Sequence, residues 1–187
     1  MSHAVAEIIP PPAAPDAGPT SFHPVERQVY RDGMARLAAA VNIITSTGED
    51  GWCGFTASAV SSVTDSPPTL LVCVNRTVQA HKAISTSGVL CVNTVAGPQE
   101  GLAMTFAGAG GNKDMKQRFA GGSWTELVTG APVLAGSIVS FDCRVTNVST
   151  IGTHDVFFCE VLAVCGGEGA TGGEALVYFD RKFHAVS

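Results

Sequence analysis

The sequence predicts a mainly β protein with short helices, in the form of an antiparallel barrel or sandwich. About seven runs of β-branched and aromatic residues are separated by turn residues and by short helical stretches. The order of these runs lacks the repeated strand–long helix–strand pattern that a parallel sheet requires. With 187 residues, the chain is long enough for one domain with a single core.

The first expected element is a helix over residues 24–38. Val25, Val29, Met34 and Leu37 recur near helical spacing, and Pro24 suits a first helical turn. Three further short helices are expected in the connections, over residues 78–86, 98–108 and 112–120.

The seven expected strands follow from β-favouring composition and from alternation. Residues 139–148 show the clearest pattern, because Val139, Phe141, Cys143 and Val145 alternate with polar residues, as in a half-buried strand. Two prolines in the segment 65–68 remove backbone donors, which indicates a loop or a sheet edge there. The expected strands cover residues 40–46, 54–64, 69–75, 89–95, 139–148, 154–167 and 174–186.

Composition excludes several classes of partner. A net charge of −5 and the lack of a Lys/Arg block disfavour nucleic acid and acidic membrane surfaces. No apolar run approaches the roughly 20 residues of a membrane-spanning helix. Hydrophobic residues make up 45% of the chain and charged residues only 14%, so apolar surface is expected to be covered in a homo-oligomer.

The N-terminus and the cysteines indicate the cellular setting. Residues 1–22 are rich in Pro and Ala and lack the pattern of a secretory signal, so we expect a flexible tail before a folded domain over 23–187. The six cysteines form no CxxC pair, which disfavours a zinc site or any other metal site. Reduced, buried cysteines in a cytoplasmic protein fit this spacing.

The strand over residues 54–64 carries unusually small side chains. Ala, Ser and Thr dominate where a core strand would carry Ile, Leu or Phe. Small side chains let a flat ligand reach the backbone, and neighbouring hydroxyls can bind phosphate or carbonyl oxygens. Close packing of the strand against a helix would explain the same composition, and the residues alone leave both possibilities open.

Other candidate motifs are weaker. The "GAGGNK" segment at residues 108–113 matches neither phosphate-binding glycine pattern, and no serine-hydrolase elbow is present. His154, followed by Asp155, is expected at the start of a strand, where a single histidine is more often structural than catalytic. Aromatic and cationic residues are grouped over 178–184, in a final strand or in the rim of a site for an aromatic anion.

Several stretches in order resemble the short-chain flavin reductases, the NAD(P)H:flavin oxidoreductases that serve two-component monooxygenases. The resemblance runs from about Tyr30 to Val186 and rests on "YRDGMARLAAAVNIIT", "GFTASAVSSVTDSPPTLLVCVN", "LCVNTV", "FAG", "IGTHDVFFCEV" and "LVYFDRKFHAV". It implies a split β-barrel of the flavin-reductase-like, FMN-binding type. It also implies a homodimer that binds FMN or FAD near its interface and takes hydride from NAD(P)H.

The resemblance also implies the site residues. His154 is expected to act in catalysis by positioning NAD(P)H, together with Asp180, Arg181, Lys182 and Phe183. The expected flavin contacts are Thr56, Ala57, Ser58, Ala59, Val60, Ser61, Ser62, Val63, Cys73, Val74, Asn75, Val78, Gln79, Phe106 and Ala107. Reduced flavin would then diffuse to a partner monooxygenase. Two alternatives stay open: a non-catalytic flavin-binding sensor, and a flavin-dependent reductase of another acceptor such as a corrinoid.

Overall fold

A computed structural model describes residues 22–111, 114–166 and 173–187. The chain divides after Met34 into two units, which are described separately. Apart from Phe22, the expected flexible tail lies outside the described residues, and so do Asn112, Lys113 and residues 167–172. None of the described helices is long and apolar enough to cross a membrane.

The first unit carries most of helix α1 (Arg27–Ala35). Gln28 donates a side-chain hydrogen bond to Asp32 at 2.8 Å, one turn further along. The helix is shorter than the expected 24–38, and Pro24 precedes it by more than one position. The helix itself was therefore predicted correctly, but Pro24 does not begin it.

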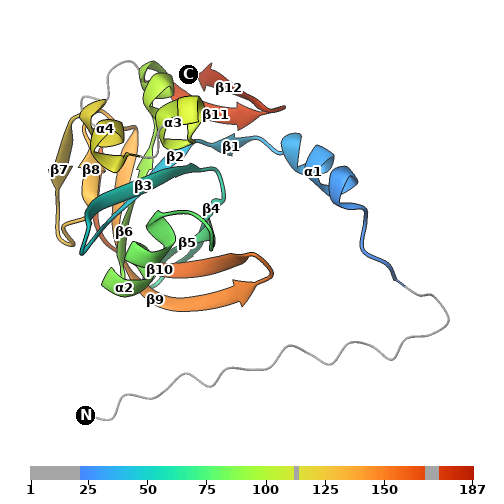
Figure 1. The fold of residues 1–187 in the computed structure, drawn as a ribbon, viewed down its shortest axis with the longest axis horizontal. Helices are drawn as coiled ribbons and strands as arrows, with labels where there is room; N and C mark the ends of the chain where they lie inside the picture. Colours follow the sequence, from blue (N-terminus) through green and yellow to red (C-terminus); the bar gives the residue numbers. More distant parts are fainter. Residues whose placement is uncertain (1–21, 112–113, 167–172) are drawn as a thin grey trace, which may run out of the picture. The chain divides into compact units, whose positions relative to one another are not determined.

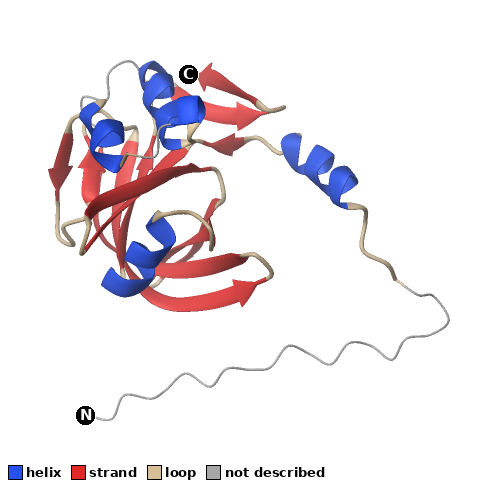
Figure 2. Cartoon of the chain, viewed as in Figure 1, coloured by secondary structure: helices blue, strands red, loops and turns tan. Residues whose placement is uncertain are grey.

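The second unit is built on a seven-stranded antiparallel sheet with the strand order β3-β2-β6-β9-β10-β5-β4. Figures 1 and 2 show that this sheet is strongly curved, with short helices in its connections. The strands are β2 (Asn42–Gly48), β3 (Gly51–Ala57), β4 (Val60–Asp65), β5 (Pro68–Asn75), β6 (Val89–Thr94), β9 (Val139–Ile151) and β10 (His154–Gly166). The mainly β prediction is confirmed.

Two small sheets and the helices complete the unit. One sheet has the order β1-β11-β12, and the other is a hairpin of β7 and β8. The bounds are β1 (Ala39–Ala40), β7 (Trp124–Glu126), β8 (Pro132–Leu134), β11 (Ala175–Phe179), β12 (Lys182–Val186), α2 (Ala80–Ser87), η1 (Gly97–Gln99), α3 (Glu100–Phe106), η2 (Ala109–Gly111) and α4 (Met115–Ala120). The four short strands β1, β7, β8 and β12 were not predicted as separate elements.

Two apolar clusters form most of the core. The larger cluster lies within the seven-stranded sheet and includes Ile44, Val72 and Phe157, with Ile84 of α2. The second includes Phe106 of α3 and Phe119 of α4, whose rings meet edge to face with centroids 5.1 Å apart. These clusters hold α2 and α3 against the sheet, and both helices carry or adjoin expected site residues.

Two expected strands are interrupted in the structure. The segment 54–64 breaks at Ser58 and Ala59, which lie between β3 and β4. The segment 174–186 is a hairpin that turns at Asp180 and Arg181, with φ angles of 48° and 62°. Two consecutive positive φ angles are typical of a tight hairpin turn. The prediction of single strands was therefore wrong at both places.

The break at Ser58–Ala59 lies between the two edges of the seven-stranded sheet, which is not closed into a barrel. β3 and β4 are consecutive in the chain, yet they form the two opposite edges of the seven-stranded sheet. A closed barrel would pair these edges directly. Here the short link joins them, and neither strand has a further neighbour in the described sheet. The edge position of β4 also agrees with the prolines at residues 67 and 68 that follow it.

Alternation along β9 predicts the strand but only part of its burial. Of the four polar residues in the pattern, Arg144 and Thr146 are exposed, whereas Ser140 and Asp142 are fully buried. Their polar atoms are satisfied, since Asp142 accepts hydrogen bonds from the backbone N–H of Val128 at 2.7 Å and of Thr129 at 2.9 Å. The expectation of a polar, solvated face was therefore wrong at these positions.

Gly54 lets helix α3 approach β3 closely. A Cβ atom added at Gly54 would lie 2.8 Å from the backbone oxygen of Ile44 and 3.0 Å from Cε1 of Phe106. Two residues further on, the hydroxyl of Thr56 donates to the backbone oxygen of Ala103 in α3 at 2.6 Å. The first part of the small-residue stretch is therefore small because a helix packs on it.

Replacing Gly54 with Ala is expected to lower the free energy of unfolding by about 1–3 kcal/mol, because the added methyl group overpacks this contact. Gly101→Ala is the matched control within α3, since a Cβ added at Gly101 meets nothing within 4 Å. That control should raise stability by about 0.5–1 kcal/mol. Urea unfolding of both variants measures the difference, and equal stability of the two would contradict the packing role of Gly54.

Candidate functional site

The second part of the small-residue stretch has a different environment from the first. Ser58, Ala59, Ser61 and Ser62 are exposed, while Thr56, Ala57 and Val60 are half-buried. No described helix packs over the exposed residues in the way that α3 packs over Gly54. Val63 is also exposed and lies at a register shift between β4 and β5. Helix packing therefore explains residues 54–56 but not residues 58–63.

The link between β3 and β4 is ordered by backbone hydrogen bonds. The N–H of Val60 donates to the oxygen of Ser58 at 3.0 Å, which makes a tight local turn. The N–H of Cys73 in β5 donates to the oxygen of Ala59 at 3.0 Å. The exposed small residues consequently stand in a fixed position beside the end of β5.

Strand register brings several expected site residues onto one face. Asn75 of β5 pairs with His154 of β10, and Cys73 pairs with Val156, so these residues share a face of the sheet. Ser61 of β4 lies on the same face, because it pairs with Leu71 of β5. We call the surface formed by Ser61, Cys73, Asn75 and His154 the outer face. All four side chains are at least partly exposed.

Two expected flavin contacts have buried side chains. Val74 is fully buried on the opposite face of β5, and Phe106 is 2% exposed within the second apolar cluster. Any ligand contact at these two positions must therefore come from the main chain. Ala107 follows α3 directly and donates its N–H to the oxygen of Ala103 at 2.9 Å.

The segment from Asn75 to Gln79 forms a succession of turns that leads into α2. The side-chain oxygen of Asn75 accepts hydrogen bonds from the backbone N–H of Thr77 at 3.0 Å and from its hydroxyl at 2.9 Å. The N–H of Val78 donates to the oxygen of Asn75 at 3.1 Å. Val78 and Gln79 are thereby held close to the end of β5.

His154 begins β10 and is half-buried. Its Nδ1 atom lies 2.9 Å from the hydroxyl of Thr153, which restrains the imidazole ring. The next residue, Asp155, faces the opposite side of the sheet. Asp155 accepts hydrogen bonds from Thr150 at 2.7 Å and from Nε2 of His81 at 2.6 Å. These bonds, first from Thr150 and then from His81, lower the pKa of Asp155.

The expected nicotinamide residues are not brought together within one chain. His154 belongs to the seven-stranded sheet, whereas Asp180, Arg181, Lys182 and Phe183 belong to the β11–β12 hairpin of another sheet. Figure 1 shows this hairpin and the β9–β10 turn on opposite sides of the second unit. Asp180 is anchored locally, with its N–H donating to the oxygen of Ala35 at 2.7 Å and its carboxylate 3.5 Å from Arg36.

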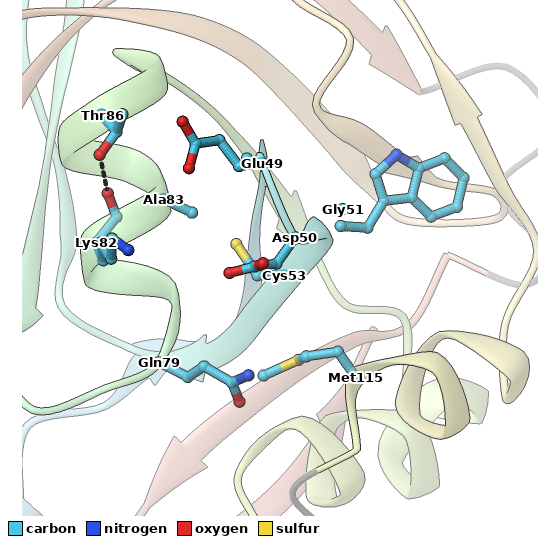
Figure 3. A pocket seen from close by; sticks show the side chains of 11 residues that line it. Glu49, Asp50, Gly51, Cys53, Gln79, Lys82, Ala83, Thr86 and Met115 are labelled. Atoms are coloured by element: carbon cyan, nitrogen blue, oxygen red, sulfur yellow. Dashed lines mark hydrogen bonds between the residues drawn. The ribbon is translucent and has the colours of Figure 1, made fainter.

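Two hollows lie beside the expected residues. One, of about 430 Å³, is mostly apolar and is lined by Val60, Ser61 and Ser62 of β4 together with Phe141, Val161 and Val164 from the sheet, among others. The other, of about 110 Å³, lies between α2 and the β2–β3 hairpin. Figure 3 shows Gln79 and Met115 extending toward each other beside it. Only the first reaches the roughly 300 Å³ typical of small-molecule sites.

The cysteines lie mostly in the core. All six are free thiols, and Cys53, Cys91, Cys143 and Cys159 are buried, while Cys165 is exposed. Burial raises the pKa of Cys53 to about 11 and that of Cys159 to about 12. A thiolate is therefore strongly disfavoured at these positions near neutral pH. The expectation of buried, unpaired cysteines is correct for four of the six.

Sequence reasoning missed two residues beside the site. Arg76 follows Asn75, and its guanidinium donates to the backbone oxygen of Gly152 at 2.8 Å. His81 forms the contact with Asp155 described above. Arg76 and His81 pair with residues that lie more than 70 positions further along the chain, so no local sequence pattern could have revealed these contacts.

Comparison with known proteins finds relatives that cover most of the chain. A model of the flavin reductase like domain matches residues 34–187. The NADH-dependent FMN reductase RutF of Stutzerimonas stutzeri is 54% identical over 164 residues, which cover 88% of this chain and 91% of the relative.

Two solved structures extend the comparison. A chain from Haemophilus somnus assigned as a flavin reductase has a TM-score of 0.81 and 43% identity, over 87% of this chain and all of the other. Component B of a nitrilotriacetate monooxygenase, in a homologue from Mycobacterium thermoresistibile, has a TM-score of 0.78 and 25% identity, over 86% of this chain and 87% of the other. The extent of these matches, together with a barrel split between β3 and β4, makes this chain a member of the flavin reductase family.

Proposed function

We propose that this protein transfers hydride from NADH to FMN and releases the reduced flavin. The observation that carries the proposal is the split between β3 and β4, where exposed small residues border a face that also carries Asn75 and His154. The preference for FMN and NADH is supported by the name of the relative that is 54% identical, an NADH-dependent FMN reductase.

The residues at the split fit a flavin. A tricyclic ring needs a slot without bulky side chains, and Ser58, Ala59 and Ser61 provide only small ones. Because β3 and β4 are edge strands, their outward backbone N–H and C=O groups can bind polar atoms of a ligand. Ring carbonyls and a phosphate require such donors, and serine hydroxyls supplement them.

The protein's part in the reaction is to bind and orient. The flavin supplies the redox chemistry, since its ring accepts hydride from a reduced nicotinamide. Backbone N–H groups at the split would stabilise negative charge that develops on the bound ring. Hydride transfer needs no general base, so His154 would hold the dinucleotide in a reactive orientation instead of moving a proton.

The simplest test is NADH oxidation by the purified protein with and without added FMN. The proposal predicts turnover that depends on FMN and reduced flavin that accumulates without oxygen. Bound flavin without turnover would favour a sensor and contradict the proposal. Turnover that requires a cobalt corrinoid, with free FMN left oxidised, would contradict it as well.

The protein is also proposed to act as a homodimer in which each site draws on both subunits. The β9–β10 turn beside His154 and the β11–β12 hairpin lie on opposite sides of the second unit (Figure 1), so a nicotinamide site that uses both requires a second copy. Apolar side chains are exposed around β9 and β10, among them Ile151 at 68% and Val164 at 59%. Surface of this kind is typically covered by a subunit interface.

Mixing two impaired variants at a low NADH concentration tests the shared site. His154→Ala and Lys182→Glu homodimers should each be impaired, but after mixed refolding about a quarter of the wild-type sites should return. One of the two sites in a mixed dimer then carries neither substitution. Activity that stays at the level of the separate variants would contradict a site shared between subunits.

The reduced flavin is proposed to serve a separate monooxygenase in the cytoplasm. A matched structure is a homologue of component B of a nitrilotriacetate monooxygenase, which supports a partner of this class. All six cysteines are free, which agrees with a reducing compartment. A flavin-dependent oxygenase separated by a dialysis membrane should still receive reduced flavin under low oxygen, and failure of that transfer would contradict diffusion.

A further inference from the structure

The loop that joins β5 to α2 is bonded to the β9–β10 hairpin at both of its ends. At the first end, the N–H of Arg76 donates to the backbone oxygen of Thr153 at 3.1 Å, and its guanidinium donates to that of Gly152 at 2.8 Å. At the second end, Nε2 of His81 lies 2.6 Å from the carboxylate of Asp155. The loop between these anchors contains Thr77, Val78 and Gln79.

The anchors enclose His154. Thr153 and Asp155 are its two neighbours in the chain, and each bonds one end of the loop. The backbone of His154 also pairs with Asn75, the residue that precedes the loop. A displacement of the loop would therefore be transmitted to both sides of His154.

The bond between His81 and Asp155 is well defined. Asp155 is 7% exposed, and its second oxygen is occupied by the hydroxyl of Thr150 at 2.7 Å. Since an ionised carboxylate only accepts hydrogen bonds, Nε2 of His81 must carry the hydrogen. The ring of His81 also meets Phe157 edge to face, with centroids 5.8 Å apart. The ring is consequently held by a charge-assisted bond and by the core.

We propose that His81, through Asp155, is a positioning residue that fixes the flavin-binding loop relative to His154. His81 would touch neither flavin nor nicotinamide. It would hold Val78, Gln79 and the imidazole of His154 in one rigid arrangement. FMN and NADH would then be bound with their reacting rings in the correct relative position. The inference rests on the proposed function, because it assigns flavin to the loop and nicotinamide to His154.

Removing the donor at His81 tests this role. His81→Leu is expected to raise the dissociation constant of FMN about tenfold and the KM for NADH by a similar factor, since a small displacement of positioning groups has effects of this order or larger. His81→Gln places an amide N–H near the position of Nε2 and should stay within about twofold of wild type. Quenching of flavin fluorescence measures FMN binding independently of turnover.

Ser85→Leu is the matched control, because Ser85 is exposed on the same helix, one turn further along. It should leave both constants unchanged. If His81→Leu lowers only the melting temperature and the folded protein binds FMN as wild type does, His81 is merely structural and the inference is wrong.

A double-mutant cycle with Asp155→Leu tests whether His81 acts on FMN binding through its hydrogen bond to Asp155. Once Asp155 is replaced, His81→Leu should weaken FMN binding no further. Fully additive effects would overturn the inference. Failure of the wild type to reduce FMN would instead overturn the proposed function, so the two failures are distinguishable.

Discussion

Replacing Ser58 with Trp is expected to lower kcat/KM for FMN by about 100-fold or more, equivalent to about 2.7 kcal/mol of lost transition-state stabilisation. Ser58 is exposed in the link between β3 and β4, where a flat ligand would need free space. The indole ring would occupy that space. The fold should survive, because the side chain of Ser58 is exposed and takes no part in the core. The melting temperature of the variant should therefore stay close to that of the wild type.

Thr125→Trp is the control for the added bulk. Thr125 is exposed in β7, which belongs to the separate β7–β8 hairpin. This variant should bind and reduce FMN as wild type does. If Ser58→Trp kept normal FMN kinetics and remained folded, the flavin could not lie at the split.

The second large effect is expected for His154→Ala, which should raise the KM for NADH about tenfold through lost positioning. The KM for FMN should change far less, because Asn75 and the small residues of β4 remain. Steady-state kinetics with each substrate varied in turn separate the two constants. His154 is half-buried and begins β10, so truncation should leave the pairing of β10 with β5 intact.

His23→Ala is the matched control, since His23 is exposed and lies before the residues that match the family. It should leave both constants unchanged. A change confined to the KM for FMN in His154→Ala would assign His154 to flavin binding and contradict its role toward NADH.

Local composition predicted most of the strands because their signals are local. The expected strand 89–95 nearly coincides with β6, and residues 69–75 fall within β5. The break at Ser58–Ala59 was not predictable from composition, because Ser and Ala are compatible with an extended strand. It follows from topology, since β3 and β4 end up at opposite edges of one sheet.

Burial along β9 shows a second limit of sequence reasoning. Alternation assumes that polar residues face water, yet Ser140 and Asp142 are fully buried. Ser140 donates to the side-chain oxygen of Asn93 at 2.8 Å, and Asn93 lies 47 residues away in the chain. Polar residues with such distant partners can be buried at little net cost, which a local pattern does not reveal.

The candidate site was predictable only in part. The small residues from Ser58 to Val63 gave a direct signal, because their lack of bulk is visible in the sequence. The resemblance to flavin reductases supplied Asn75 and His154, and strand register brings these two together. The hydrogen bond between His81 and Asp155 could be found only in the structure, because the two residues lie 74 positions apart in the chain.

A crystal structure of the protein grown with excess FMN tests the central claim most directly. The account predicts flavin ring density in van der Waals contact, at about 3.5–4 Å, with the main chain of residues 58–62 and beside Asn75. Ring density at another surface, or a split filled by the protein's own side chains while FMN is bound elsewhere, would contradict it.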